Sequence, residues 1–393
     1  MLFNRPFEEV HAEDQQALSD FLRSENIEEN IIASVISSGY YTVPGYSESI
    51  FDSFYGNAWG GVSSFSKKNF IEQIKSGNPL FRKDPEVHYI SRIDDIQDIL
   101  LSDERSTFYL NNGFLSFRGQ TKEYTIQRAF PNLSMANRDR NERLIIPGVW
   151  RKYYPDFNKR RLDGEFYNFF TTILADDLIY HGIPDYKTLG DRNYEKYGIH
   201  TMSDLEDFPE WENQEYYRRW QDFKVAGSFN NHLAVVCQHY GLETTGLDVS
   251  FDFKTAGFFA TNRFEYKNNG KATFYPVADD KHEGVIYCFY FRAPTLTATR
   301  DIITSLASFD HMKPTRPIRQ QCAMPFFLYD KFNEAAVNLY KVFYLKKDFN
   351  PTSIASKEYL FPGEDEDDFY KALLDVKKSR KDKFFDSFVE YEF

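Results

Sequence analysis

The sequence predicts an α+β fold, with a mixed or antiparallel sheet core and helical additions before residue 88 and after residue 362. Apolar residues recur at helix-like intervals near the N-terminus, and three short segments farther on are rich in the β-branched and aromatic residues typical of strands. At 393 residues the chain exceeds one typical domain, so we expect a main domain with added segments.

Residues 1–87 are predicted to form a helical N-terminal segment. Two short helices are expected there, because eight apolar residues follow helical spacing: Leu18, Phe21, Leu22, Ile27, Ile31, Ile32, Val35 and Ile36. The stretch GNAWGGVSSFSKK that follows is typical of a loop. We expect the main domain to cover residues 88–375 and residues 376–393 to form a helical tail.

Three strands are predicted in the main domain: GFLSFRG, GVIYCFYF and MPFFLYD. The second is expected at the centre of the sheet, because it is apolar almost throughout and would be buried on both faces. Residues 181–222 are polar and aromatic, and we interpret them as an inserted loop and helix.

A basic segment, residues 138–161, carries eight Lys or Arg against three acidic residues. Four aromatic residues lie within it: Trp150, Tyr153, Tyr154 and Phe157. Interleaved basic and aromatic side chains suit a single-stranded nucleic acid, such as RNA, because they meet backbone charge and base faces together. The alternative is a solvated helix with its aromatic residues turned inward. The net charge of −12 argues against a generic nucleic-acid coat.

Cysteine use and hydropathy predict a cytoplasmic protein that is not bound to a membrane. The three cysteines, Cys237, Cys288 and Cys322, are far apart and show no CxxC spacing, which is typical of a reducing compartment. We find neither a secretion signal nor eighteen consecutive apolar residues. His232 and His239 stand seven residues apart with no third ligand type nearby, so no metal is expected.

Common catalytic motifs are absent from the sequence, but three other stretches stand out. The chain contains no GxSxG, GxGxxG, GxxxxGK[ST] or HExxH motif. In FLSFRGQTKEYTIQRAF, Arg118 stands between an apolar run and a glycine, an unusual position for an ordinary surface charge. The second stretch is VVCQHYGLETTGLDVSFDFKTAGFFAT, and the third is RPIRQQCAMPFFL.

These stretches resemble, in order, the motifs of the FRG domain, a family named for its Phe-Arg-Gly run. The residues that match are Phe117, Arg118, Gly119 and Gln120, then Gln238, His239, Tyr240, Gly241, Leu247, Asp248, Ala256, Phe259 and Ala260, then Arg316 and Gln320. Cys322 stands where glycine is usual, and the closing YLFPG, residues 359–363, also fits. The resemblance covers about residues 88–375.

One part of the second motif departs from the family. The usual Pro-Thr-Arg-Leu-Leu-Asp-Trp is replaced here by residues 243–249, which read ETTGLDV. A basic residue and a tryptophan are thereby lost. Any ligand contact that the family makes through that arginine is therefore not carried over to this chain.

The order of the motifs is similar to that of the ADP-ribosyltransferase fold, in which NAD is bent in a cleft between two small sheets. The resemblance implies that NAD is bound by Phe117, Arg118, Gly119, Gln120, His239, Tyr240 and Arg316. Arg118 would grip the diphosphate through paired charged hydrogen bonds. Gly119 would let the backbone pass close to the ligand. The alternative for Arg118 is a buried ion pair with Asp248 or Asp252.

Arg118, Asp248 and Gln320 are the predicted catalytic residues. Gln320 stands where such transferases place a glutamate, and it brings no charge. A carboxylate about 4 Å from a developing cation is worth roughly 4 kcal/mol at an effective dielectric near 20, or about a thousandfold in rate. Asp248 is therefore expected to supply the carboxylate, and Gln320 to orient the ribose. The alternative for Asp248 is a turn or helix cap.

His239 and Tyr240, in the second stretch, can each be interpreted in two ways. His239 either caps a helix that Gly241 closes or contacts the adenosine ribose or the acceptor. Tyr240 either stacks on nicotinamide or fills the sheet. Phe117, Phe258 and Phe259 are interpreted as core residues.

The sequence thus predicts an NAD-dependent ADP-ribosyltransferase that modifies an intracellular nucleic acid or protein. Such a protein would be a toxin or antiviral, phage-defence effector, and a regulatory partner protein would fit that role. The alternative is a non-catalytic FRG module that binds a nucleotide or a partner, because Gln320 replaces a charged residue. An interaction scaffold built from the helical ends ranks last, since it leaves SFRGQ and RQQ without purpose.

Overall fold

The structure is a computed structural model of the chain. It describes residues 10–43, 48–56, 64–78, 84–136, 140–148, 151, 181, 236, 238–241, 246–267, 271–278, 283–291, 313–323, 333–379 and 390–392. The strand predicted at MPFFLYD, the insertion beyond residue 181 and the four aromatic residues of the basic segment lie outside these ranges. No helix in the described ranges is long and apolar enough to span a bilayer.

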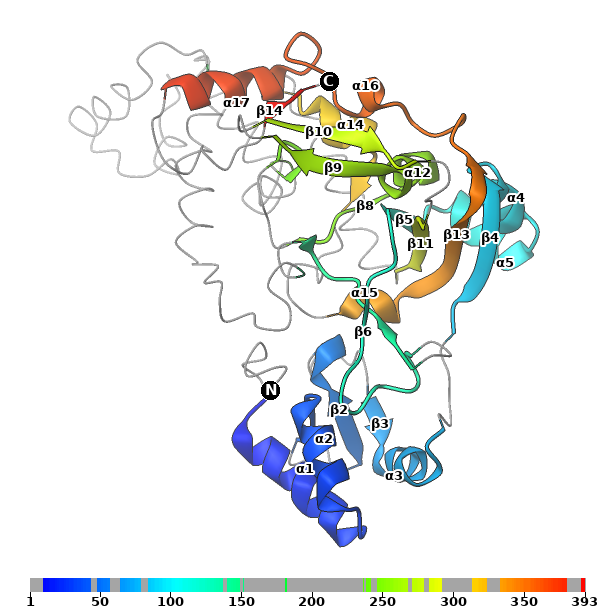
Figure 1. Ribbon diagram of the computed structural model, residues 1–393, viewed down its shortest axis with the longest axis vertical. Helices are drawn as coiled ribbons and strands as arrows, with labels where there is room; N and C mark the ends of the chain where they lie inside the picture. Colours follow the sequence, from blue (N-terminus) through cyan, green and yellow to red (C-terminus); the bar gives the residue numbers. More distant parts are fainter. Residues whose placement is uncertain are drawn as a thin grey trace, which may run out of the picture.

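A six-stranded sheet forms the core, and the predicted α+β class is confirmed. The strands lie in the order β12-β8-β5-β11-β13-β4 (Figure 1). Their bounds are β4 Glu86–Arg92, β5 Leu115–Gln120, β8 Val249–Ser250, β11 Val285–Tyr290, β12 Cys322–Ala323 and β13 Leu339–Asn350. All neighbours are antiparallel except β13 and β4, so the sheet is mixed.

Strand β11 lies between β5 and β13, at the centre of the sheet as predicted. Five of its six residues are buried, because each face of the sheet is covered by a separate hydrophobic cluster. On one face Ile286 and Cys288 pack with helix α12 (Phe253–Thr261), and on the other Val285, Tyr287 and Phe289 pack with residues that include Ile145 and Leu247. The apolar composition of this strand is therefore explained by burial on both sides.

Helix α12 lies directly against β5 and fixes the position of that strand. Asp252 is the N-cap residue of the helix, and its carboxylate accepts hydrogen bonds from the backbone N–H groups of Lys254 and Thr255. These bonds satisfy two of the N–H groups that a helix leaves open at its start. Helices α4 (Asp95–Leu101) and α5 (Glu104–Asn111) follow β4 along the chain. Helix α4 adds Ile96 and Leu100 to the same cluster, and Tyr109 and Leu110 of α5 pack against it.

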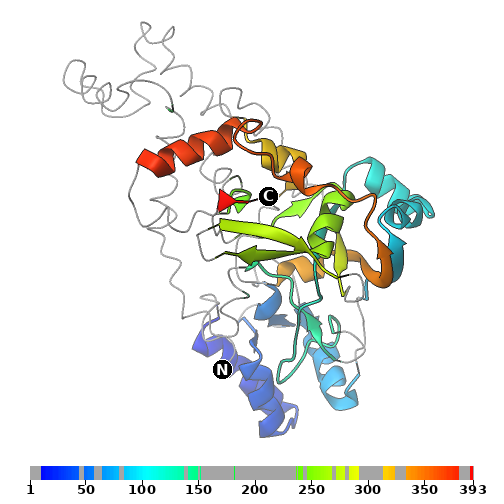
Figure 2. The ribbon, with the colours of Figure 1, turned by 45° about the horizontal axis from the view of Figure 1, so that its top comes forward.

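A second, three-stranded sheet lies above the first in Figure 1, with the order β14-β10-β9. It comprises β9 (Asn262–Tyr266), β10 (Lys271–Pro276) and β14 (Glu390–Tyr391). Helix α17 (Asp368–Ser379) precedes β14, and the short helices α14 (Thr315–Arg319) and α16 (Lys357–Leu360) lie nearby (Figure 2). The prediction of a helical tail at residues 376–393 was thus wrong for Glu390–Tyr391, which form strand β14 and pair with β10.

The N-terminal segment contains both expected helices, α1 (Ala12–Ser24) and α2 (Glu29–Ser37). It also contains an antiparallel sheet, so a purely helical segment was wrong. The further elements are β1 Tyr40–Tyr41, β2 Ser49–Asp52, the 3₁₀ helix η1 Ser53–Tyr55, β3 Ser64–Ser66 and α3 Lys67–Ser76. Together these elements form the N-terminal unit, at the lower end of Figure 1.

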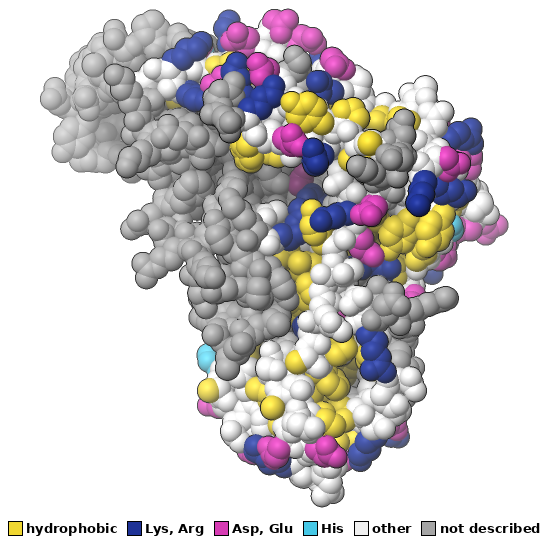
Figure 3. All heavy atoms as spheres, viewed as in Figure 1, with side chains coloured by type: hydrophobic (Ala, Val, Ile, Leu, Met, Phe, Trp, Pro, Cys, Tyr) yellow, Lys and Arg dark blue, Asp and Glu magenta, His cyan; other side chains and the backbone are white. Residues whose placement is uncertain are grey.

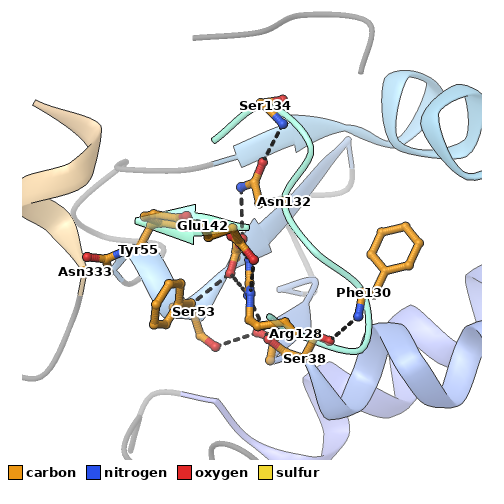
Figure 4. A network of polar contacts seen from close by, with 12 residues as sticks. Ser38, Ser53, Tyr55, Arg128, Phe130, Asn132, Ser134, Glu142 and Asn333 are labelled. Carbon is orange, nitrogen blue, oxygen red and sulfur yellow. Dashed lines mark hydrogen bonds and ion pairs between the residues drawn. The ribbon is translucent and has the colours of Figure 1, made fainter. Parts of the chain in front are cut away.

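A buried ionic network joins the N-terminal unit to the main domain (Figure 4). Arg128 follows β6 (Thr125–Ile126), and its five N–H donors bond the carboxylates of Asp52 and Glu142 and the carbonyl oxygen of Ser38, at 2.7 to 2.9 Å. Both carboxylates are fully buried with the arginine. Glu142 lies in β7 (Glu142–Arg143), and Tyr55 donates to it. The two units are therefore held together by ion pairs that are buried from solvent.

Replacing Arg128 by methionine is expected to lower the free energy of unfolding by about 3–5 kcal/mol, because two buried carboxylates lose their counter-charge. Urea denaturation measures this. The matched control is Arg92→Met, since Arg92 is exposed and pairs with Asp95 at the surface, where a change of about 0.5 kcal/mol or less is expected. Equal effects of the two substitutions would contradict this account of the network.

Candidate functional site

A cavity of about 560 Å³ is lined by residues of both sheets, a volume typical of small-molecule sites. Strand β5, the segment around Asp248 and the residue after helix α14 supply its polar side chains, and β9, β10 and β14 supply aromatic ones. The cavity therefore joins the first and third motifs of the sequence to part of the second.

Arg118 reaches this cavity because side chains alternate along β5. Phe117 is fully buried against α12, whereas Arg118 and Gln120 point to the opposite face, where they line the cavity. The Nη1 of Arg118 donates to the carbonyl oxygen and to Oδ1 of Asp248, both at 2.6 Å. Of the two alternatives, the structure thus contains the ion pair with Asp248, while Asp252 caps α12.

The ion pair with Asp248 leaves some N–H donors of the Arg118 guanidinium without a hydrogen bond among the described residues. Both hydrogen bonds come from Nη1, and Nε is buried without a partner among the residues described. The side chain of Gln120 is also buried, and neither its nitrogen nor its oxygen has a partner in the described part of the chain. Buried polar atoms are normally paired, so these atoms mark a place that a ligand can satisfy.

The structure explains the glycine at position 119 by its contact with helix α12, whereas the motif resemblance implied that it allows a ligand close to the backbone. A Cβ at this position would lie 1.7 Å from the carbonyl oxygen of Ala256 and 2.8 Å from the backbone nitrogen of Ala260, both in α12. The close approach of β5 to the helix therefore already requires glycine at this position, which also lines the cavity. Packing of α12 onto β5 depends on the missing side chain.

Asp248 is held from two sides. Besides Arg118, the amide of Gln238 donates to its Oδ1 at 2.8 Å. Burial raises the pKa of this carboxyl most strongly, but the attraction of Arg118, the effect of His239 and the hydrogen bonds to the carboxylate together outweigh burial, and the pKa lies below its ordinary value. Asp248 is therefore ionised at neutral pH. It is not a helix cap, because Asp252 has that role in α12.

Gln320 and His239 lie next to each other in the cavity wall. The Nδ1 of His239 and the Oε1 of Gln320 are 2.6 Å apart, and the amide of Gln320 donates to the carbonyl oxygen of Leu360. Burial lowers the pKa of His239, so the imidazole is neutral near pH 7. Its Nε2 is buried without a partner among the described residues. His239 thus bonds a side chain rather than the last carbonyls of a helix.

The third motif forms a short helix around Gln320. Gln320 is the C-cap residue of α14, and β12 begins two residues later. Five residues form this helix, which is too few for a periodic pattern to reveal. The side chain of Gln320 nevertheless faces the cavity, because the helix end turns it toward His239.

The structure does not bring Tyr240 or Arg316 to the cavity. Arg316 is fully buried, donates to the carbonyl oxygen of Pro362, and has Tyr240, Tyr370 and Tyr391 at 3.8 to 5.0 Å from its guanidinium to the ring centroids. The hydroxyl of Tyr240 donates to Asp367. These two residues stabilise the packing of α17 by cation–π and hydrogen-bond contacts. In the described structure both residues therefore have a structural role away from the cavity, and neither lines it.

Two features of the cavity are absent from the predicted site. Arg151 lines it, although the sequence indicated this residue only as part of the basic segment. An aromatic wall formed by Phe259, Phe264, Tyr266, Phe274, Phe361 and Tyr391 lines the other side. Phe258, in contrast, is buried core as expected. The described residues contain no group of three or more His, Cys, Asp or Glu placed to hold a metal ion.

Comparisons with known proteins leave the site without an assigned role. No protein-family model, no curated protein and no solved structure matches the chain. The resemblance to the FRG domain therefore rests on the motif residues alone.

Gly119→Ala is expected to lower the free energy of unfolding by about 1–3 kcal/mol or more, because the new methyl group overlaps the backbone of α12. Thermal or urea denaturation measures the loss. Gly148→Ala is the control, since a Cβ there meets only Arg151 at 3.5 Å, an ordinary contact. A stable Gly119→Ala protein would show that α12 does not pack on β5 as described.

Asp248→Asn is expected to change how stability depends on pH. The pKa of Asp248 is lower in the folded protein than its ordinary 3.8, so its contribution to stability is present above about pH 4 and is lost as the pH falls further. The difference in urea midpoint between wild type and variant should therefore be largest at neutral pH and shrink below pH 4. A difference that stays constant from pH 7 to pH 3 would argue against an ionised Asp248.

Proposed function

We propose that the cavity binds NAD and that the protein is an ADP-ribosyltransferase, as the resemblance to the FRG domain implies. The observation that carries the proposal is Arg118, whose guanidinium lines the cavity with Nε left unbonded among the described residues. A guanidinium binds a diphosphate through parallel N–H donors, which a lysine cannot reproduce. The ion pair with Asp248 holds this group in one orientation.

The aromatic wall supports the same proposal. Phe264, Phe274 and Tyr391 lie on neighbouring strands of the second sheet and line the cavity opposite β5. A base or a nicotinamide ring gains stacking energy on such side chains, whereas the diphosphate needs charge. The cavity offers both kinds of surface within a single volume, as a dinucleotide requires.

Asp248 is the proposed catalytic carboxylate. In ADP-ribosyl transfer the bond between the ribose C1′ and the nicotinamide nitrogen breaks, and nicotinamide leaves with the bonding electron pair. The positive charge that develops on the ribose is stabilised by an ionised carboxylate. A nucleophile of the acceptor then bonds to C1′ and loses its proton. Gln320, held by Leu360, orients the ribose, and the acceptor is an intracellular nucleic acid or protein.

A second candidate function is nucleotide binding without catalysis. Among the described residues that line the cavity, Asp248 is the one acidic residue, and it is already neutralised by Arg118. Gln320 is engaged with His239 and Leu360. In that case the cavity recognises a nucleotide and the flanking units pass the signal to a partner protein.

Purified protein incubated with NAD is expected to release nicotinamide and to transfer label from NAD to RNA, DNA or cell extract. Asp248→Asn should retain NAD binding but reduce release about a thousandfold, because the charge that stabilises the ribose cation is lost. Arg118→Ala should lose both binding and release. Calorimetry and nicotinamide quantification separate these effects.

Arg92→Ala is the matched control, because Arg92 lies on the edge strand β4 and does not line the cavity. Its binding and release should equal those of the wild type. NAD binding without any nicotinamide release would exclude the transferase and support the binding module. Measurable nicotinamide release that is equal in wild type and Arg118→Ala would exclude the transferase function at this site, and NAD binding that is equal in the two proteins would exclude both functions there.

A further inference from the structure

The residues that line the cavity carry a charge opposite in sign to that of the chain. Among the described residues that line it are Arg118, Arg151 and Arg263 and a single acidic residue, Asp248, although the whole protein has a net charge of −12. Arg263 is paired with Glu265, so the excess comes from Arg151 beside the pair of Arg118 and Asp248. On the face shown in Figure 3, acidic and basic side chains are interspersed over the described surface. Excess positive charge in a concave site concentrates anions there.

Arg151 contributes to this excess and has no acidic salt-bridge partner in the part of the chain that the structure describes. The salt bridge of Asp248 is made to Arg118, and the Nη1 of Arg151 is buried with no partner among the described residues. The guanidinium of Arg151 lies 4.6 Å from the ring centroid of Tyr124, a neutral contact. Burial, and next the charge of Arg118, lower the pKa of Arg151 to about 10.

Two guanidinium groups near each other in a partly buried site destabilise the free protein. Each repels the other, and a buried donor without a partner costs the hydration that it has lost. Residues that bind a ligand commonly carry such a cost, which is recovered when the ligand arrives. The ligand that recovers it here must be an anion large enough to meet both groups.

We propose that Arg151 is a second anchor for phosphate beside Arg118, so that the cavity selects ligands with two adjacent phosphates over those with one. This inference rests on the proposed NAD site and defines its substrate class as diphosphate-bearing nucleotides. The two arginines come from β5 and from the segment after β7, so the diphosphate would bridge two parts of the chain.

A purely structural role for Arg151 makes the opposite prediction about stability. Were the contact with Tyr124 the reason for this residue, Arg151→Gln would lower the thermal midpoint of the free protein. If Arg151 is instead a cation whose partner is a bound ligand, Arg151→Gln should raise the thermal midpoint of the free protein. The free protein therefore distinguishes the two roles before any ligand is added.

The experiment compares wild type with Arg151→Gln, using pyrophosphate, ADP-ribose and AMP as probes in calorimetry and thermal shift. The wild type should bind ADP-ribose at least tenfold more tightly than AMP. Arg151→Gln should lose about tenfold to a hundredfold in affinity for pyrophosphate and ADP-ribose, and much less for AMP, because a charged hydrogen bond is removed. Its thermal midpoint without ligand should be above that of the wild type.

Arg105→Gln is the control for the loss of one positive charge, because Arg105 lies on α5 and does not line the cavity. It should bind all probes like the wild type. Unchanged affinity in Arg151→Gln, or a variant that is less stable without ligand, would overturn the assignment of Arg151. Pyrophosphate binding that depends on Arg151 without any NAD binding would keep that assignment and remove the proposed NAD function.

Discussion

The ion pair between Arg118 and Asp248 is the contact on which the cavity depends. It joins β5 to the residue before β8 across 130 positions of the chain, and it fixes the direction of the guanidinium. The same pair keeps Asp248 ionised in a site where burial alone would favour its protonated form. One interaction therefore fixes both the guanidinium of Arg118 and the carboxylate of Asp248 in the cavity.

The N-terminal unit is tied to the chain segment that borders the cavity. Arg128 and Glu142 hold that unit from the segment of β6 and β7 (Figure 4). Tyr124 and Arg151, on either side of this hairpin in the sequence, line the cavity. The backbone N–H of Leu144 donates to the carbonyl oxygen of Tyr124, so the flanks of the hairpin are fixed to each other. The buried network thus supports the cavity as well as the domain contact.

The aromatic side chains of the main domain have three structural roles. Rings such as Phe117 and Tyr287 fill the two faces of the main sheet, three tyrosines surround the buried Arg316, and the rings of the second sheet line the cavity. Composition cannot separate these uses, because a ring gains from burial in all three. Which rings remain open to a ligand depends on how the two sheets are placed.

The sequence by itself determined the elements with strong local patterns. The periodicity of α1 and α2, the apolar run of β11 and the alternation that turns Arg118 away from Phe117 are all readable along the chain. Only the tertiary structure decided that Arg118 pairs with Asp248 rather than Asp252, that Gly119 faces α12, and that Arg151 reaches the cavity. The physical reason is that these contacts join residues far apart in sequence, whereas α14 and β14 are too short to carry any period.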